Sequence, residues 1–230
     1  MHVQNITALF QKQLKDSLKN LPVLVLFLVY PIIALVMTQA MKSQEGMETF
    51  FVSIFATMHC VFTPLVSTNS IIAEEKEQNT LRVLFMSNVT LKEYLLSIGG
   101  FVLLSNLITS CFFLLLIDYT AKQSLLFLLS IGIGSLISII LGACLALFSK
   151  NASAANGIAV PFGMVFAFLP MLANFNATLE SISKFTFSQQ VSYLLAGKEL
   201  STFGLIVLVV NFIILSSIAA LLYSRSNSED

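Results

Sequence analysis

The sequence predicts an all-α integral membrane protein with six transmembrane helices. Of its 230 residues, 57% are hydrophobic and 10% are charged, and the mean hydropathy is +0.88. A soluble domain carries about a quarter charged residues. Backbone polar groups find no partner in lipid, so apolar stretches of roughly 20 residues cross a bilayer as helices. Six such stretches lie within one transmembrane domain over 1–230, at 21–41, 50–72, 94–117, 124–148, 157–173 and 203–223.

Lys and Arg in the short loops predict the orientation of these spans, because they accumulate on the cytoplasmic side. With the N-terminus inside, the inner segments hold eight basic residues and the outer segments hold four. Both termini are therefore expected in the cytoplasm, with the chain in the cell membrane. The inner residues are Lys12, Lys15, Lys19, Lys76, Arg82, Lys92, Lys150 and Arg225, and the outer ones are Lys42, Lys122, Lys184 and Lys198.

Two further segments are predicted to be helical without crossing the membrane. Residues 3–21 carry one apolar stripe at spacings of three and four, which predicts an N-terminal helix lying in the inner interface. Its members are Val3, Ile6, Phe10, Leu14, Leu18 and Leu21. Residues 174–200, before the last span, are too polar to cross simply. They predict short outer-leaflet helices, partly re-entrant.

No Asp or Glu lies in the middle of any predicted span. A proton- or sodium-driven carrier usually needs an ionisable or densely polar site near the midplane. Apart from thiols and tyrosines, His59 is the one titratable side chain at that depth. Thr63, Ser67 and Asn69 make the same span polar. These four residues either line a substrate path or form hydrogen bonds between helices, and the sequence leaves both readings open.

Patterns for catalysis and cofactor binding are absent from the sequence. His2 and His59 do not have metal-ligand spacing, and no G-x-x-x-x-G-K-[ST] phosphate loop occurs. A net charge of zero gives no indication of a nucleic-acid partner. We therefore expect a non-enzymatic chain that binds no cofactor or metal. If it moves a solute uphill, the energy should come from a separate protein on the cytoplasmic side.

A charged stretch and an amphipathic segment separate the second and third spans. Each charge of Glu74–Glu77 would cost roughly 2.5–3.5 kcal/mol at the centre of a membrane helix, so this cluster should end the second span at the cytoplasmic surface. Leu81, Leu84, Phe85 and Val89 then share one helical face, after Asn79 or Thr80 as a cap. Thr90 and Glu93 have capping-box spacing and should start the third span. The segment is a short cytoplasmic helix, either held by a partner or lying on lipid.

The stretch 74–96, "EEKEQNTLRVLFMSNVTLKEYLL", resembles the signature of type-2 ABC exporter permeases. That signature has an acidic-lysine cluster, then Thr-Leu, a hydrophobic pair, a break, and a new helix with a charged start and a Tyr. The six-span layout extends the resemblance over the chain. The family often has Gly where this chain has Asn79 and Pro where it has Asn88. Asn tolerates the left-handed backbone that Gly serves, whereas the missing Pro leaves the geometry of the break open.

The resemblance implies a coupling helix that docks on a separate ATPase, which binds ATP and Mg. Two permease subunits, identical or related, would assemble with two ATPases, and the substrate route would run between the permeases near the second and fifth spans. The implied substrate is amphipathic: a drug, an antimicrobial peptide or a lipid-like molecule. The residues carried over to ATPase docking are Glu74, Glu75, Lys76, Glu77, Thr80, Leu81, Leu84 and Phe85, with the glutamates facing the ATPase or neighbouring basic residues.

Three rival functions fit a polytopic chain of this composition. An ion-gradient-driven carrier or channel would work without an ATPase. A membrane-embedded lipid enzyme would depend on one polar residue, most plausibly His59. An immunity or assembly factor would tolerate disruption of the coupling helix.

Overall fold

The computed structural model describes residues 3–19, 21–41, 44, 46–87 and 89–226. Within these residues the chain forms ten helices and no strand. The helices are α1 Val3–Lys19, α2 Leu21–Ala40, α3 Met47–Glu77, α4 Thr80–Met86, α5 Leu91–Leu114, α6 Ala121–Phe148, α7 Ala152–Ala173, α8 Ala177–Ser183, α9 Phe187–Leu195 and α10 Thr202–Ser226.

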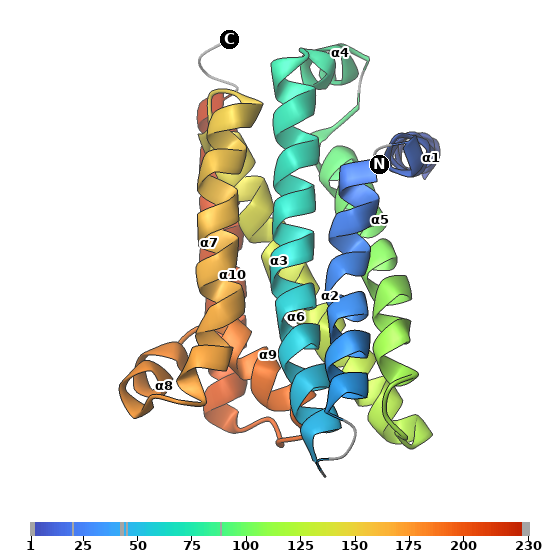
Figure 1. Ribbon diagram of the computed structural model, residues 1–230. Coiled ribbons are helices and arrows are strands. Elements are labelled where there is room, and N and C mark those ends of the chain that lie inside the picture. Colours follow the sequence, from blue (N-terminus) through green and yellow to red (C-terminus); the bar gives the residue numbers. More distant parts are fainter. Residues whose placement is uncertain (1–2, 20, 42–43, 45, 88, 227–230) are drawn as a thin grey trace.

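Six long helices stand side by side as a bundle (Figure 1), and each contains an apolar window long enough to cross a membrane. They are α2, α3, α5, α6, α7 and α10. The predicted all-α membrane class and its six spans are therefore confirmed. Helix α3 is the centre of the bundle, because it packs against α2, α5, α6, α7 and α9. Most of its length is buried, whereas α10 is largely exposed to the surroundings of the bundle.

Small residues allow α3 to approach its neighbours closely. A Cβ added at Gly142 of α6 would lie 2.3 Å from the backbone oxygen of Leu65 in α3. At Gly163 of α7 it would lie 3.0 Å from the Phe62 ring. Backbone approach of this kind gains dispersion contacts that membrane helices need, because lipid supplies little hydrophobic drive between them. These two glycines thus serve packing within the chain.

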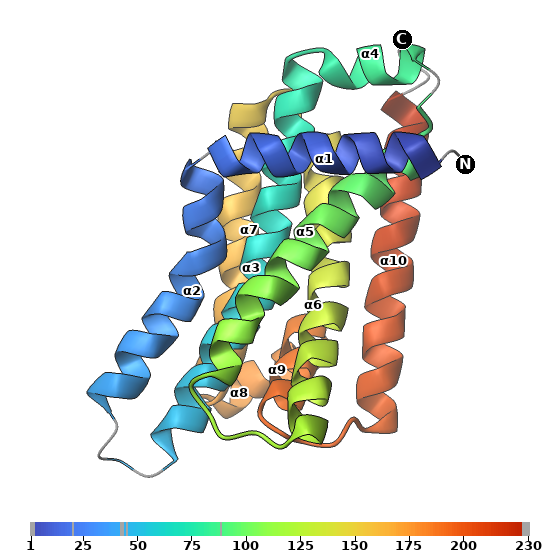
Figure 2. The ribbon, with the colours of Figure 1, turned by 90° about the vertical axis from the view of Figure 1, so that its right-hand side faces the viewer.

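The two ends of the bundle carry different short elements. Helices α1 and α4 lie at one end, together with the first and last described residues, and α8 and α9 lie at the other (Figure 1). Helix α1 runs across the ends of the spans rather than along them (Figure 2). Its predicted apolar stripe is only partly turned towards the protein. Leu14 and Leu18 are exposed, while Leu9, Gln13 and Ser17 are buried against the bundle.

The end of α3 and the start of α5 differ from the predicted span limits, and charge and capping explain these differences. The second span was predicted to stop at residue 72, but α3 continues to Glu77 and has 31 residues. At 1.5 Å per residue it is about 46 Å long, well beyond a hydrocarbon core of roughly 30 Å, so its charged end extends past the apolar part of the membrane. Thr90 forms the predicted capping box with Glu93, and α5 begins at Leu91. The third span therefore starts one turn earlier than its hydropathy indicates.

We predict that Gly142→Ala lowers the thermal stability of the chain, because its methyl group would force α6 away from the α3 backbone. Overpacking of this kind costs about 1–3 kcal/mol. Gly132→Ala in the same helix is the matched control, since nothing lies within 4 Å of its added Cβ. Thermal unfolding of both variants in one detergent should show a loss for Gly142→Ala alone. Equal melting temperatures would contradict the close approach.

Candidate functional site

The charged end of α3 forms a polar junction with α1 and α5. Glu75 is 7% exposed and accepts hydrogen bonds from Lys12, Gln13 and Tyr94. Gln13 Nε2 lies 2.8 Å from Glu75 Oε1, and Lys12 forms an ion pair with the same oxygen. A buried carboxylate is stable when its oxygens receive several donors and a counter-charge, and Glu75 has both. This junction joins the N-terminal helix to the second and third spans.

Lys76 and Glu77, the next two residues of α3, contact the ends of α6 and α7. Lys76 Nζ donates to the carbonyl oxygens of Leu147, at 3.1 Å, and Ser149, at 2.9 Å, at the C-terminus of α6. Glu77 Oε2 accepts from the backbone N–H of Ala152, at 3.1 Å, at the N-terminus of α7. Cations are favoured at helix C-termini and anions at N-termini, so both contacts have the sign that the helix dipoles favour. Glu75, Lys76 and Glu77 together are called the α3 clamp below.

A second buried carboxylate fixes α1 to the start of α5. Glu93 is 0% exposed and accepts from the Thr90 backbone N–H at 3.0 Å and from Asn5 Nδ2 at 3.3 Å. One turn on, Ser97 donates to the Ile6 carbonyl oxygen. Helix α1 is therefore held along its length by polar contacts to α5 and to the α3 clamp.

Helix α4 follows the clamp after a two-residue turn. Asn79 has φ +57°, the left-handed conformation that the sequence allowed it in place of Gly. Leu81 and Leu84 are half-buried and pack towards the protein core, whereas Val83 is 60% exposed and Met86 is 77% exposed. The outward apolar face of α4 is thus Val83 and Met86, called the α4 face below.

The docking residues that the resemblance implies make different kinds of contact in the structure. Glu75 meets a basic residue of its own chain, Lys12. Lys76 and Glu77 contact helix ends, and Glu74 is exposed. Thr80 is half-buried, and the Phe85 side chain lies outside the described part of the structure. Sequence reasoning missed the α4 face and the α1 partners of the carboxylates. A helical wheel that placed Val83 and Met86 away from the side shared by Leu81 and Leu84 would have indicated the first.

A cleft opens between α1 and the α3–α4 corner. It has a volume of about 370 Å³. Two carboxylates that are exposed, Asp16 and Glu74, line it together with Gln78 and Thr80. Lys12 also borders the cleft, but Glu75 engages its ammonium group. The cleft therefore presents negative charge beside the α4 face.

The four polar residues predicted for a substrate path are all buried in this conformation. His59 Nε2 lies 3.0 Å from Thr109 Oγ1 in α5, and Thr63 donates to the Leu26 carbonyl oxygen in α2 at 3.1 Å. Ser67 donates within its own helix, to the Thr63 carbonyl oxygen. These contacts join α3 to two of its antiparallel neighbours, α2 and α5.

Asn69 reaches a different helix, and it leaves one acceptor unused. Its Nδ2 donates to Asn156 Oδ1 of α7 at 2.9 Å, and Ser70 donates to the same oxygen. Among the described residues, Asn69 Oδ1 and Thr68 Oγ1 are buried without a hydrogen-bond partner. Unpaired buried polar atoms are rare and costly in native proteins. Asn106 Oδ1 of α5 and Ser138 Oγ of α6 are likewise buried without a partner, so unpaired polar atoms lie on several helices of the membrane core.

The fold and its ends define a polytopic helical membrane protein with a short helix presented beyond the spans. Comparison with protein families assigns it further: the chain matches the model described as ABC-2 family transporter protein over residues 3–223. The chain belongs to this family, and it is a membrane permease subunit that is not itself catalytic. Family membership implies an ABC ATPase partner in general terms. No curated protein and no solved structure matches the chain.

We predict that Glu75→Gln loosens α1 from the bundle, because it removes the counter-charge of Lys12 and weakens three hydrogen bonds. Hydrogen bonds to charged groups contribute about 1.5–3 kcal/mol, so α1 amides should lose roughly tenfold or more of their hydrogen-exchange protection. Exchange in detergent, read by mass spectrometry, measures this. Glu74→Gln is the matched control at an exposed neighbour. Unchanged α1 exchange in Glu75→Gln would refute the junction.

Proposed function

We propose that this chain is the membrane subunit of an ATP-driven exporter that moves an amphipathic substrate, such as a drug, an antimicrobial peptide or a lipid-like molecule. A separate ATPase binds ATP and Mg, and a second permease subunit, identical or related, completes the transporter. The family supports the transporter class, and the lack of mid-span carboxylates argues against coupling to an ion gradient.

The α4 face is the observation that carries the proposal. Exposed Val83 and Met86 lie on a helix at the end of the bundle, beyond the apolar windows of the spans (Figure 2). Exposed apolar side chains rimmed by polar ones mark a surface suited to a protein partner. We infer that the ATPase covers this face, and that Asp16 and Glu74 of the neighbouring cleft receive a basic side chain of the ATPase.

The contacts of the α3 clamp suggest how movement of the docked ATPase would reach the membrane. A force on α4 acts on the end of α3, from which Glu75 connects to α1 and α5. Lys76 and Glu77 connect the same end to α6 and α7. Because α3 is a continuous helix through the bundle, its displacement would shift several spans together. We infer that the substrate route opens along α3 and α7, where the unpaired polar atoms of Thr68 and Asn69 would gain partners.

The proposed placement is the cytoplasmic membrane with the α1–α4 end inside, which puts both termini in the cytoplasm. The excess of Lys and Arg in the segments at this end supports it. The ATPase then meets α4 in the compartment that contains ATP.

We predict that Val83→Asp combined with Met86→Asp abolishes ATPase association at normal membrane abundance, because two charges would be desolvated in an apolar interface. Affinity purification in mild detergent, followed by mass spectrometry, should recover a stoichiometric partner with a G-x-x-x-x-G-K-[ST] loop from the unaltered chain and not from the variant. Ser153→Asp is the matched control, since it adds charge in the exposed first turn of α7 at the same end.

The choice of position matters in this experiment. Leu84→Asp, which the sequence alone suggests, would also disturb packing within the chain because Leu84 is half-buried. The Val83 and Met86 side chains can change without that effect. Retention of the ATPase by the double variant would overturn docking at the α4 face. Recovery of the unaltered chain without any ATPase would favour the carrier and enzyme readings.

We predict cytoplasmic labelling of Gln78→Cys by a membrane-impermeant thiol reagent, with reaction only after the cells are opened. Gln78 is exposed at the turn between α3 and α4. Thr178→Cys, exposed in α8 at the opposite end, should react in intact cells. Both are made with the exposed native Cys111 replaced by Ser. The reverse pattern would invert the proposed orientation.

A further inference from the structure

The prolines of the chain are confined to one side of the bundle. All five lie within α2, α3 and α7, whereas α5, α6 and α10 contain none. Pro31, Pro64 and Pro161 interrupt the interiors of α2, α3 and α7, and Pro170 lies near the end of α7. The three helices are neighbours, because α3 packs against both α2 and α7. The bundle therefore has a proline-containing side and a proline-free side.

Three of these prolines lie at one level of the bundle, around the side chain of Phe62. The Phe62 ring contacts the Tyr30 ring at a centroid distance of 6.0 Å, and Tyr30 immediately precedes Pro31. The same ring would lie 3.0 Å from a Cβ added at Gly163, which follows Pro161 by two residues. The interior proline of α3 follows Phe62 itself by two residues. Each proline is therefore within about 3 Å, along its own helix axis, of a residue of this contact.

Each of these prolines makes its helix easier to bend. Proline has no N–H, so the carbonyl group four residues earlier loses its usual helical donor, and the proline ring crowds that carbonyl. Sharp kinks in helices occur mostly at proline. A single proline is tolerated in a membrane span, but three at one level of neighbouring helices allow those helices to bend together. The carbonyl groups affected are those of Phe27, Cys60 and Gly157.

The two halves of α3 on either side of Pro64 are attached to the proline-free side in different ways. The half towards α4 carries the α3 clamp, and its Leu65 backbone lies against Gly142 of α6. The half towards α8 and α9 has apolar packing and a polar contact to α5, with His59 Nε2 3.0 Å from Thr109 Oγ1. Charged contacts resist displacement more strongly than apolar packing does, because they are directional and break over short distances. The half towards α8 and α9 is therefore the freer one.

We propose that Pro31, Pro64 and Pro161 form one bending zone. The segments of α2, α3 and α7 between this zone and the α8–α9 end bend as a group against α5, α6 and α10, and the Phe62 ring, in contact with α2 and α7, couples their movement. This inference goes beyond the proposed function and requires neither the ATPase nor a particular substrate. In the exporter proposed above, the bending opens the α8–α9 end while the α3 clamp keeps the opposite end closed.

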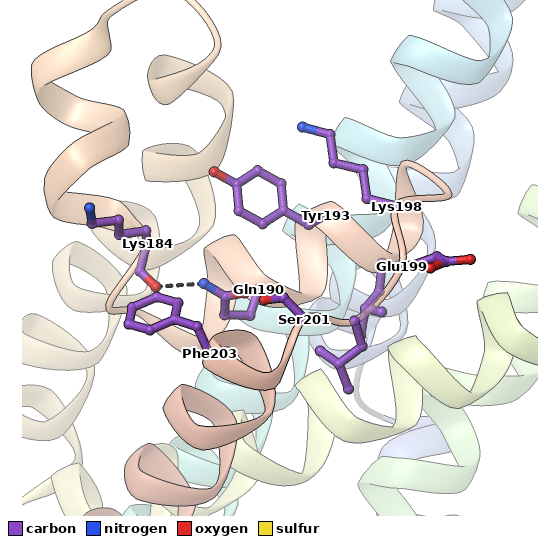
Figure 3. Close-up of a pocket in the computed structure, with 9 residues that line it drawn as sticks. Lys184, Gln190, Tyr193, Lys198, Glu199, Ser201 and Phe203 are labelled. Atoms are coloured by element: carbon purple, nitrogen blue, oxygen red, sulfur yellow. Dashed lines mark hydrogen bonds between the residues drawn. The ribbon is translucent and has the colours of Figure 1, made fainter.

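Free volume at the α8–α9 end gives this movement room. A pocket of about 220 Å³ lies among α9, the start of α10 and Lys184 at the α8–α9 junction (Figure 3). Gln190 Nε2 donates to the Lys184 carbonyl oxygen, which ties the junction to α9 (Figure 3). Helix α8 packs against α7, whereas α9 also packs against α6, so the junction connects the two sides of the bundle. Close-packed interiors resist deformation, and a space beside this junction lowers that resistance.

Spin labels on α7 and α5 test the bending zone, because these helices lie on opposite sides of the bundle (Figure 1). One pair of labels reports the α8–α9 end and the other reports the α1–α4 end, in a chain whose exposed Cys111 is replaced by Ser. The pairs, all at exposed positions, are Phe168→Cys with Phe112→Cys and Ser153→Cys with Leu96→Cys. Phe168 follows Pro161 by seven residues, about 10 Å along the helix, so a bend of about 20° moves its label by about 4 Å.

Pulsed electron spin resonance on the full chain in lipid nanodiscs should give a distance distribution about 4 Å broader for the Phe168–Phe112 pair than for the Ser153–Leu96 pair. Pro64→Ala with Pro161→Ala restores two helical N–H groups, so it should narrow the first distribution and leave the second unchanged. Pro170→Ala is the matched control. It removes a proline of the same helix beyond the label, and it should narrow neither distribution.

Equal widths for the two pairs in the chain with its prolines intact would overturn the proposal, as would a broad first distribution that survives both alanine substitutions. The second pair shows whether the double variant keeps its fold. If that distance is lost, Pro161→Ala alone gives the same test, since it restores one N–H group in the labelled helix. The measurement uses the chain without a partner, so a missing ATPase would count against the proposed function and not against the bending zone.

Discussion

The architecture depends on where the charges at the end of α3 find partners. Glu75, Lys76 and Glu77 occupy consecutive positions that project in different directions around a helix, so each meets a different neighbour. Left without those neighbours, Glu75 would be a buried charge in a poorly solvated place, at a cost of several kcal/mol. The requirement for partners therefore draws α1, α5, α6 and α7 to one point. The small residues of α6 and α7 then determine how closely the helices pack below that point.

The clamp and the packing have complementary physical roles. Dispersion contacts along α3 are numerous and non-directional, and they tolerate small sliding movements between helices. Hydrogen bonds to charged groups are directional and break over short distances. A bundle whose charged contacts are concentrated at one end can thus pivot there while its spans slide elsewhere. The unpaired acceptor of Asn69, whose amide nitrogen contacts α7, lies on the side where such sliding would relieve a cost.

Much of the fold was predictable from sequence, because membrane helices are specified by local properties. Six apolar runs, the Thr90–Glu93 capping box and the tolerance of Asn79 for a left-handed backbone are all readable over a few residues, and the structure contains each. The extension of α3 to Glu77 was not predictable, since hydropathy indicates where the apolar segment ends and not where the helix ends. The docking and substrate-path residues remain predictions. The orientation of the α4 side chains could not be predicted from sequence, because the side of α4 that faces inward depends on α5 and on the core beneath it.

The difference between the inner and outer sides of α4 suits this helix to the coupling role that we propose for it. The inner side of α4, with Leu81 and Leu84, is attached to the protein core, while its outer side, with Val83 and Met86, remains available. An element attached on both sides could not meet a partner, and one attached on neither could not transmit force. The left-handed turn at Asn79 sets this division, because within two residues of the clamp it redirects the chain so that α4 lies across the end of the bundle (Figure 2). In the mechanism that we propose, a push on the outer side of α4 reaches Glu75, Lys76 and Glu77 through a turn of only two residues.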